Sequence, residues 1–187
     1  MAEVATPERV EIRLSGSGGQ GVLLGATILA EAATALGRHV VQAQSYGPAA
    51  RGGASRAEVI VSTSEIDYPE VITPHASLCL SQEAWDKFAA DTLAGGLVLY
   101  DSGLITAAAE LPGLDVRGIA FANLAAERLG KTVVANIVAV GAFVELTGVL
   151  PAAAVEEAVV RRVPARFREL NVEAYRLGRL AALGELE

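Results

Sequence analysis

The residues with the clearest chemical potential form a glycine-rich run, Gly16-Ser17-Gly18-Gly19-Gln20-Gly21. Its spacing matches G-x-G-x-x-G, and it lies between a short apolar segment and a longer segment rich in alanine and leucine. Glycines allow a tight turn and a close approach of the backbone to a ligand, and the first amides of a following helix attract an anion. The run therefore predicts either a phosphate cradle or a turn that only lets a helix pack tightly on its strand.

Two common ligands of such loops do not fit the neighbouring residues. A dinucleotide site needs a carboxylate about 20 residues further on, at the end of the second strand, but residues 41–45 read Val-Gln-Ala-Gln-Ser. A nucleoside triphosphate loop needs Lys and then Ser or Thr after its last glycine, where this chain has Val22 and Leu23. The run is therefore not interpreted as a site for NAD or for a nucleoside triphosphate.

A second unusual passage, Ser-Tyr-Gly-Pro-Ala-Ala-Arg-Gly-Gly at 45–53, follows the second predicted strand. Tyr46 and Arg51 have the polar reach to bind an anion or a partner chain, and Gly52 and Gly53 let backbones approach each other. The alternative is an ordinary surface loop of turn residues. In a parallel sheet this passage shares the carboxyl edge with the glycine run, which is where ligands of open α/β sheets bind.

The remaining reactive residue types exclude several classes of function. Cys79 is the only cysteine, so the chain alone can build no disulfide framework, zinc knuckle or iron–sulfur cluster. Its apolar surroundings favour inert packing. Two histidines without a Ser or Cys partner pattern give little support to a hydrolase triad, and a net charge of -7 argues against nucleic acid. No catalytic and no metal-binding residue is predicted.

These motifs need a scaffold of alternating strands and helices, and 187 residues suit one domain, 1–187. Strands are predicted at 10–14, 39–42, 54–62, 76–80, 97–100 and 116–120, and helices at 22–36, 82–90, 123–129, 133–146, 151–162 and 164–183. Gly37 and Ser81 stand where a helix would end and begin. The predicted fold class is α/β: a Rossmann-like three-layer domain with a mostly parallel sheet, helices on both faces and a helical C-terminal third.

Asn136 is the most informative residue of that helical third. It interrupts the longest apolar stretch, Val133–Leu146, which is also too short for a membrane span. A buried amide needs partners, so Asn136 either satisfies a nearby loop or faces a subunit interface. The N-terminus lacks the apolar core of a secretory signal, so a cytoplasmic location is expected.

The pairing of the glycine run at 16–21 with the passage at 45–53 resembles the gamma subunit of the 2-oxoacid:ferredoxin oxidoreductases, which act on pyruvate, 2-oxoglutarate, ketoisovalerate or indolepyruvate. Two later passages are similar to this family as well: Val-Ala-Asn-Ile-Val-Ala-Val-Gly-Ala at 134–142 and Val-Pro-Ala-Arg-Phe-Arg-Glu-Leu-Asn at 163–171. The resemblance extends from about Arg9 to Arg176. Four motifs in the same order are far more specific than any one of them. One departure is Ala49-Ala50, where many members have larger or charged residues before the arginine, so side-chain contacts are reduced there.

The resemblance implies a role in a complex that decarboxylates a 2-oxoacid on thiamine diphosphate, passes electrons through iron–sulfur clusters to ferredoxin and releases an acyl-CoA. Thiamine diphosphate and the clusters are expected in partner subunits, since this chain has no Gly-Asp-Gly thiamine motif and one cysteine. The implied partners are thiamine-binding alpha and beta subunits, with a ferredoxin-like delta subunit as a further candidate. The implied ligand is coenzyme A (CoA) at the glycine run, with Tyr46, Arg51, Gly52, Gly53 and Asn136 as further binding residues.

Two other interpretations stay open at this point. One is a structural interaction subunit whose glycine run binds nothing, and the other is a stand-alone Rossmann-type dehydrogenase. The high apolar share, 52 %, suggests a surface partly covered by partners, so the isolated chain is expected to form homodimers.

Overall fold

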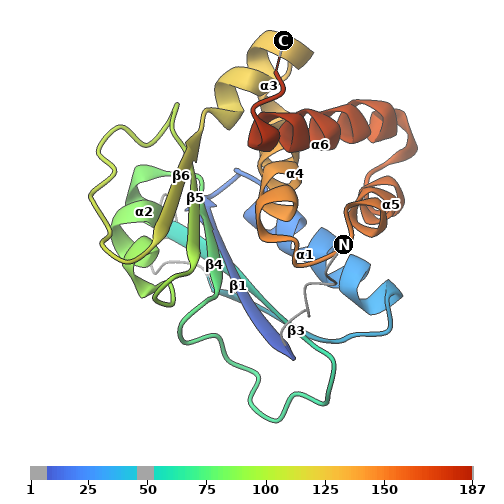
Figure 1. Ribbon diagram of the computed structural model, residues 1–187. Helices are drawn as coiled ribbons and strands as arrows, with labels where there is room; N and C mark the ends of the chain where they lie inside the picture. Colours follow the sequence, from blue (N-terminus) through green and yellow to red (C-terminus); the bar gives the residue numbers. More distant parts are fainter. Residues whose placement is uncertain (1–7, 46–52, 187) are drawn as a thin grey trace.

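The six-stranded sheet is the centre of the molecule, and its strands follow the order β2-β3-β1-β4-β5-β6 in the computed structural model, which describes residues 8–45 and 53–186 (Figure 1). β1 pairs in parallel with β4, β4 with β5 and β5 with β6, whereas β3 is antiparallel to both β1 and β2. Five strands therefore run in one direction. The strands are β1 (Arg9–Ser17), β2 (His39–Ser45), β3 (Ala54–Ser62), β4 (Ala76–Cys79), β5 (Leu97–Asp101) and β6 (Asp115–Ile119).

Helices cover both faces of this sheet, as the sequence predicts. On one face α1 and α4 pack directly on the sheet, while α5 and α6 pack behind them; α2 lies on the opposite face (Figure 1). The main core joins Ile12, Leu14 and Leu78 to these helices. The helices are α1 (Val22–Ala35), α2 (Gln82–Phe88), α3 (Phe121–Leu129), α4 (Ala135–Thr147), α5 (Ala152–Arg162) and α6 (Arg168–Leu183), with short 3-10 turns at Ala89–Asp91, Thr132–Val134 and Ala165–Phe167.

Local signals explain where these elements begin and end. Gly37 follows α1 with a φ of 74°, and the Arg38 amide after it donates to the Ala33 carbonyl, which closes the helix end. The Ser81 hydroxyl accepts from the Ala84 amide at the start of α2. Both boundaries agree with the sequence predictions. No helix in the described ranges is long and apolar enough to cross a membrane.

Two features of the sheet differ from the predictions. β1 continues to Ser17 instead of ending at Leu14, because β3 pairs with it over the whole of Arg9–Ser17. β2 continues to Ser45, because its pairing with β3 reaches Arg56. The first two residues of the glycine run are therefore strand residues, and β2 and β3 form an antiparallel pair at one end of the sheet.

A buried arginine ties the α2 face together. Arg13 of β1 is 2 % exposed, and its guanidinium lies 2.7 Å from Glu58 on β3 and 2.7 Å from Asp91 after α2. The guanidinium also lies over the ring of Phe88, as does that of Arg56. Because a buried charge is costly unless it is paired, this cluster fixes β1, β3 and α2 relative to one another.

Candidate functional site

The glycine run forms the sharp connection between β1 and α1. Gly16 and Ser17 pair with Ser55 and Ala54 of β3, so the turn itself comprises Gly18 to Gly21. Gly19 and Gly21 have φ values of 89° and 72°, in the left-handed region that favours glycine. Gly21 is the residue that caps α1, and its carbonyl accepts the first helical hydrogen bond from Gly25.

The Gln20 side chain braces this turn from within. Its Oε1 accepts from the Ser17 amide at 2.6 Å, and its Nε2 donates at 2.7 Å to the carbonyl of Leu80, the residue directly after β4. A Cβ on Gly16 would lie 2.7 Å from the same Oε1. The spacing predicts Gln20 as a binding residue. In the structure its side-chain amide holds the turn against the residue that follows β4.

Asn136 reaches the same turn from α4. Its Nδ2 donates to the Gly21 carbonyl at 3.4 Å, and the residue is 8 % exposed. A Cβ on Gly21 would collide with this side-chain amide. Of the two partners predicted for the buried amide, the nearby loop is therefore the one found, across 115 residues of sequence.

A shallow pocket of about 290 Å³ opens beside the turn. Its lining comes from the turn, the start of α1, the end of β2 and the start of β3: Ser17, Gly18, Gly19, Gly21, Val22, Leu23, Gln44, Ser55, Arg56 and Ala57. The Ser55 hydroxyl donates to the Gly16 carbonyl at 3.0 Å. A volume of this size suits a phosphate or pyrophosphate group with its nearest atoms, and it is too small for a whole coenzyme.

The electrostatics of this pocket favour an anion. The amides of Val22, Leu23 and Leu24 belong to the first turn of α1, where a helix has no carbonyls of its own to accept them. No acidic residue lies in that first turn. Arg56 is the one charged residue of the described lining, but its guanidinium lies on the α2 face, over the ring of Phe88 and 3.7 Å from Glu58, whose closer partner at 2.7 Å is Arg13.

The same lining contains no Cys, His, Asp or Glu among the residues described, so its two serines have no side-chain base beside them in that lining. Cys79 lies nearby in β4 but is fully buried, and burial raises the pKa of its thiol to about 11. The arrangement is suited to holding an anion.

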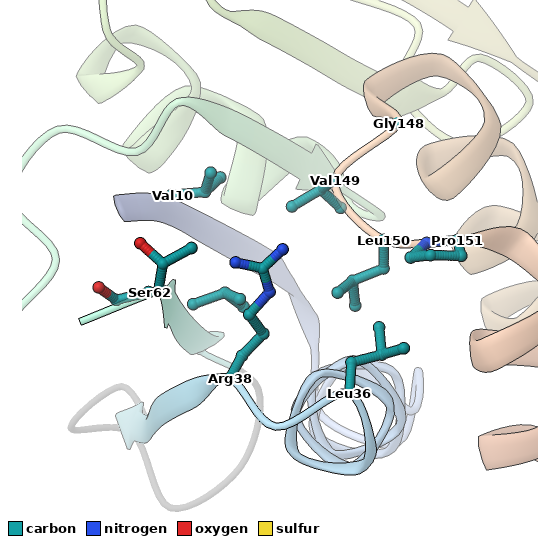
Figure 2. A pocket seen from close by; sticks show the side chains of 10 residues that line it. Val10, Leu36, Arg38, Ser62, Gly148, Val149, Leu150 and Pro151 are labelled. Atoms are coloured by element: carbon teal, nitrogen blue, oxygen red, sulfur yellow. The ribbon is translucent and has the colours of Figure 1, made fainter. Parts of the chain in front are cut away.

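A larger hollow lies at the other end of the sheet, away from the glycine run. It measures about 480 Å³, and Figure 2 shows Arg38 reaching into it between Ser62 and Val149. Leu36 at the end of α1 and Gly148 at the end of α4 also line it. The C-terminal ends of α1 and α4 and the N-terminal end of α5 meet at this hollow, and Arg38 is the charged residue of its lining.

Asp101 at the carboxyl end of β5 also has a structural explanation. Its carboxylate accepts from the Gly103 amide at 2.9 Å and from the Ala122 amide at 3.0 Å, so it holds the beginning of α3. Burial raises the pKa of this carboxyl, and the amide hydrogen bonds oppose that shift. In the described ranges no three His, Cys, Asp or Glu residues gather as a metal site.

The structure brings most of the described candidates together. Gly16, Ser17, Gly18, Gly19, Gln20 and Gly21 form the turn with Asn136 behind it, and Gly53 directly precedes β3, whose Ala54 pairs with Ser17. Tyr46, Arg51 and Gly52 lie outside the described residues. Sequence reasoning missed Arg56 and Gln44. Only the antiparallel register of β1 and β3, which residue periodicity does not reveal, places Arg56 beside the turn.

Comparison with known proteins gives a consistent family match. Residues 11–181 match the family described as pyruvate ferredoxin/flavodoxin oxidoreductase. The 2-oxoglutarate synthase subunit KorC of Methanocaldococcus jannaschii is 44 % identical over 173 residues, which cover 91 % of this chain and 92 % of that subunit. The pyruvate synthase subunit PorC of Methanothermobacter marburgensis is 30 % identical, covering 90 % and 94 %.

Solved structures show the same fold. The gamma subunit of a keto/oxoacid ferredoxin oxidoreductase from Geobacter sulfurreducens matches with a TM-score of 0.86 and 46 % identity, covering 96 % of this chain and 99 % of that one. The 2-oxoglutarate:ferredoxin oxidoreductase of Magnetococcus marinus, solved with 2-oxoglutarate, coenzyme A and succinyl-CoA, matches with a TM-score of 0.84 and 21 % identity. That match covers 95 % of this chain and 31 % of the longer chain, and it shows the fold alone.

Proposed function

Because the chain belongs to the pyruvate ferredoxin/flavodoxin oxidoreductase family, as a gamma subunit of 2-oxoacid:ferredoxin oxidoreductases, we propose that it supplies part of the CoA site in a complex that converts 2-oxoglutarate to succinyl-CoA. Support for the substrate is that KorC subunits of 2-oxoglutarate synthases match over nearly their whole length at 40–44 % identity, against 30–31 % for pyruvate synthase subunits. The thiamine diphosphate and the iron–sulfur clusters belong, in this proposal, to alpha, beta and delta partners.

The observation that carries the CoA role is the space in front of Gly18. Its φ lies outside the left-handed region, and an added Cβ would meet no atom of the described chain within 4 Å. Neither backbone torsion nor packing explains a glycine at this position. A ligand bound directly against the turn would explain it, because backbone amides can contact a phosphate closely only where no side chain stands between them.

Arg56 supports the same proposal through its charge. Arg56 borders the pocket from β3, its guanidinium lies over Phe88 on the α2 face, and its nearest carboxylate is already held more closely by Arg13. CoA carries a pyrophosphate and a 3′-phosphate, and an arginine binds phosphate oxygens through charge-assisted hydrogen bonds. We propose the turn amides as the contacts to one of these phosphates, with Arg51 as a cation. Arg56 can add its charge only by turning away from Phe88 on the α2 face.

The test is the Michaelis constant for CoA in the reconstituted complex, with 2-oxoglutarate saturating. Gly18→Val should raise this constant about tenfold or more, because the side chain would occupy the space in front of the turn. Arg56→Gln should raise it several-fold, and Arg51→Ala by about 10- to 150-fold, which corresponds to about 1.5–3 kcal/mol.

Matched controls separate this effect from damage to the fold or to assembly. Ala109→Val changes an exposed loop residue in the same way as Gly18→Val, and Arg117→Gln removes an exposed arginine from the far edge of the sheet. Both should leave the constant unchanged. If Gly18→Val and Arg56→Gln assemble normally and also leave it unchanged, the glycine run only packs a helix and the CoA role is wrong.

A further inference from the structure

The two edges of the sheet are finished in different ways. β6 has Asp115 and Arg117, both exposed and joined by a 2.7 Å ion pair, on its five residues. β2, at the other edge, has no charged side chain and no proline after His39; residues 40–45 read Val-Val-Gln-Ala-Gln-Ser. Natural proteins usually protect an edge strand with charges, prolines, bulges or a short length. β2 has seven residues, and beyond His39 it has neither a charged side chain nor a proline.

One side of β2 has no strand against it. β3 takes its other side from His39↔Ser62 to Ser45↔Arg56, and no strand of residues 8–45 or 53–186 lies beyond β2. Residues 42–45 are exposed. An unprotected edge of this length presents a row of backbone donors and acceptors that can add a strand from another chain.

We propose that this edge is covered by β2 of a second copy of the chain, paired antiparallel about a two-fold axis to give one continuous sheet. A two-fold axis brings the same strand of each copy together, so the contact is self-complementary. In such a pair uncharged residues face uncharged residues over 40–45, so no like charges meet.

The net charge of the chain favours this face over others for a contact between copies. Each copy has a formal charge of -7, so two copies repel each other wherever acidic surfaces would meet. Residues 40–45 add no charge to the interface. The contact between copies can therefore form here without bringing carboxylates together.

Helix α1 extends the same surface. The Gln42 amide of β2 donates to the Thr27 hydroxyl of α1 at 3.1 Å, and Leu23, 39 % exposed, lines the turn pocket together with Gln44. Both of these positions are uncharged, and Glu31, one turn beyond Thr27, is paired with Arg162 at 3.4 Å. A strand pair alone is smaller than a stable interface of about 1,200–2,000 Å² requires, and in this proposal the α1 helices of the two copies supply the rest.

The purified full-length chain tests this by sedimentation and by hydrogen–deuterium exchange at increasing micromolar concentration. We expect dimers, with β2 amides becoming protected as the dimer forms. Ala43→Lys, at an exposed position near the middle of β2, should weaken the dimer by about tenfold or more, because like charges then lie close across the two-fold axis.

A charge swap makes the test specific. Ala43→Lys and Ala43→Glu should each be mostly monomeric, and an equimolar mixture of the two should recover dimers; Ala109→Lys, which adds the same charge in a distant exposed loop, should dimerise like the parent chain. A monomeric parent chain would overturn the proposal, and so would a dimer whose dissociation constant is unchanged by Ala43→Lys. Protection of β2 only after partner subunits are added would assign the edge to a different chain. None of these readouts depends on CoA.

Discussion

The glycines of the turn meet three different physical requirements. Gly19 has a left-handed φ, but an added Cβ would meet nothing within 4 Å. Gly21 has a left-handed φ and the Asn136 amide against it, while Gly18 has neither constraint. One motif therefore combines a torsional glycine, a torsional and steric glycine, and a glycine that the described chain does not itself need.

Alanine substitution should separate these requirements. Gly18→Ala should change the free energy of unfolding by less than about 0.5 kcal/mol, Gly19→Ala should lower it by about 1–2 kcal/mol, and Gly21→Ala should lower it more than Gly19→Ala does. Urea denaturation of the three variants measures the order. The double variant Gly21→Ala with Asn136→Ala should recover only the part of the stability loss that comes from the collision with the Asn136 side chain. A Gly18→Ala variant as unstable as Gly21→Ala would contradict this assignment.

Cys79 should behave as an inert thiol in the native chain. Burial raises its pKa from 9.0 to about 11, so near pH 8 only about 0.1 % would be thiolate, and the side chain is fully buried. We expect one equivalent of a thiol reagent to react after denaturation and almost none before it. Native labelling faster than the unfolding rate would contradict this.

The same shift gives a pH dependence with a definite sign. The folded state holds the thiol proton more tightly than the unfolded state, so unfolding releases it as pH rises. The contribution of Cys79 to the free energy of unfolding is constant well below pH 9 and decreases between pH 9 and about 11. Subtracting the pH profile of Cys79→Ala from that of the parent chain isolates this contribution, which should be absent if the thiol titrates normally.

Helices α4 and α6 approach each other through two glycines. A Cβ on Gly178 of α6 would collide with the Val138 carbonyl of α4, and a Cβ on Gly141 of α4 would collide with the Tyr175 carbonyl of α6. These obstacles are backbone atoms, which cannot move aside without separating the helices. Gly178→Ala should therefore lower the free energy of unfolding by about 1–3 kcal/mol, although alanine is the better helix former by about 1 kcal/mol.

Gly25 of α1 is a matched control for this prediction. It is also a buried helical glycine, but an added Cβ would meet only the side-chain ends of Leu14 and Val140 at 3.0 Å. Gly25→Ala should therefore cost clearly less than Gly178→Ala in the same thermal or chemical denaturation. Equal costs would mean that the backbone contact between α4 and α6 is not what requires glycine.

The elements were largely predictable because their signals are local. Alternating and apolar runs located all six strands of the described ranges, and Gly37 and Ser81 marked a helix end and a helix start correctly. The direction of β3 was not predictable, since side chains alternate in the same way in parallel and antiparallel strands. The predicted length of β1 was too short, because its last residues are part of the strand only through their pairing with β3.

The candidate site was predictable only where it is continuous in sequence. The glycine run and its position before a helix follow from glycine chemistry, and the buried amide of Asn136 indicated a partner. Arg56 enters through the register of a neighbouring strand, and Arg13 is a buried arginine in what reads as an apolar strand. Both depend on contacts between distant segments, which spacing along the chain does not encode.

At the scale of the whole molecule, the chain is one subunit of a multi-subunit oxidoreductase complex. In our proposal the thiamine site and the clusters lie in partner subunits, so the purified chain should turn over no 2-oxoacid even with thiamine diphosphate, CoA and an electron acceptor. Addition of the partner subunits should restore acyl-CoA formation, measured by the release of CO₂ and by the thioester. Turnover by the pure chain would contradict the assignment as a non-autonomous subunit.

The brace that Gln20 forms between the Ser17 amide and the Leu80 carbonyl has a thermodynamic consequence. A turn that is already fixed has little conformational entropy left to lose when an anion binds, so the ordering cost of about 0.5–1.5 kcal/mol per immobilised group is largely avoided. Without the Gln20 side chain, the turn would lose this conformational entropy when the anion binds. A Gln20→Ala chain would then bind the anion more weakly than the parent chain, with the loss in the entropy of binding and not in its enthalpy, although Gln20 itself need never touch the ligand.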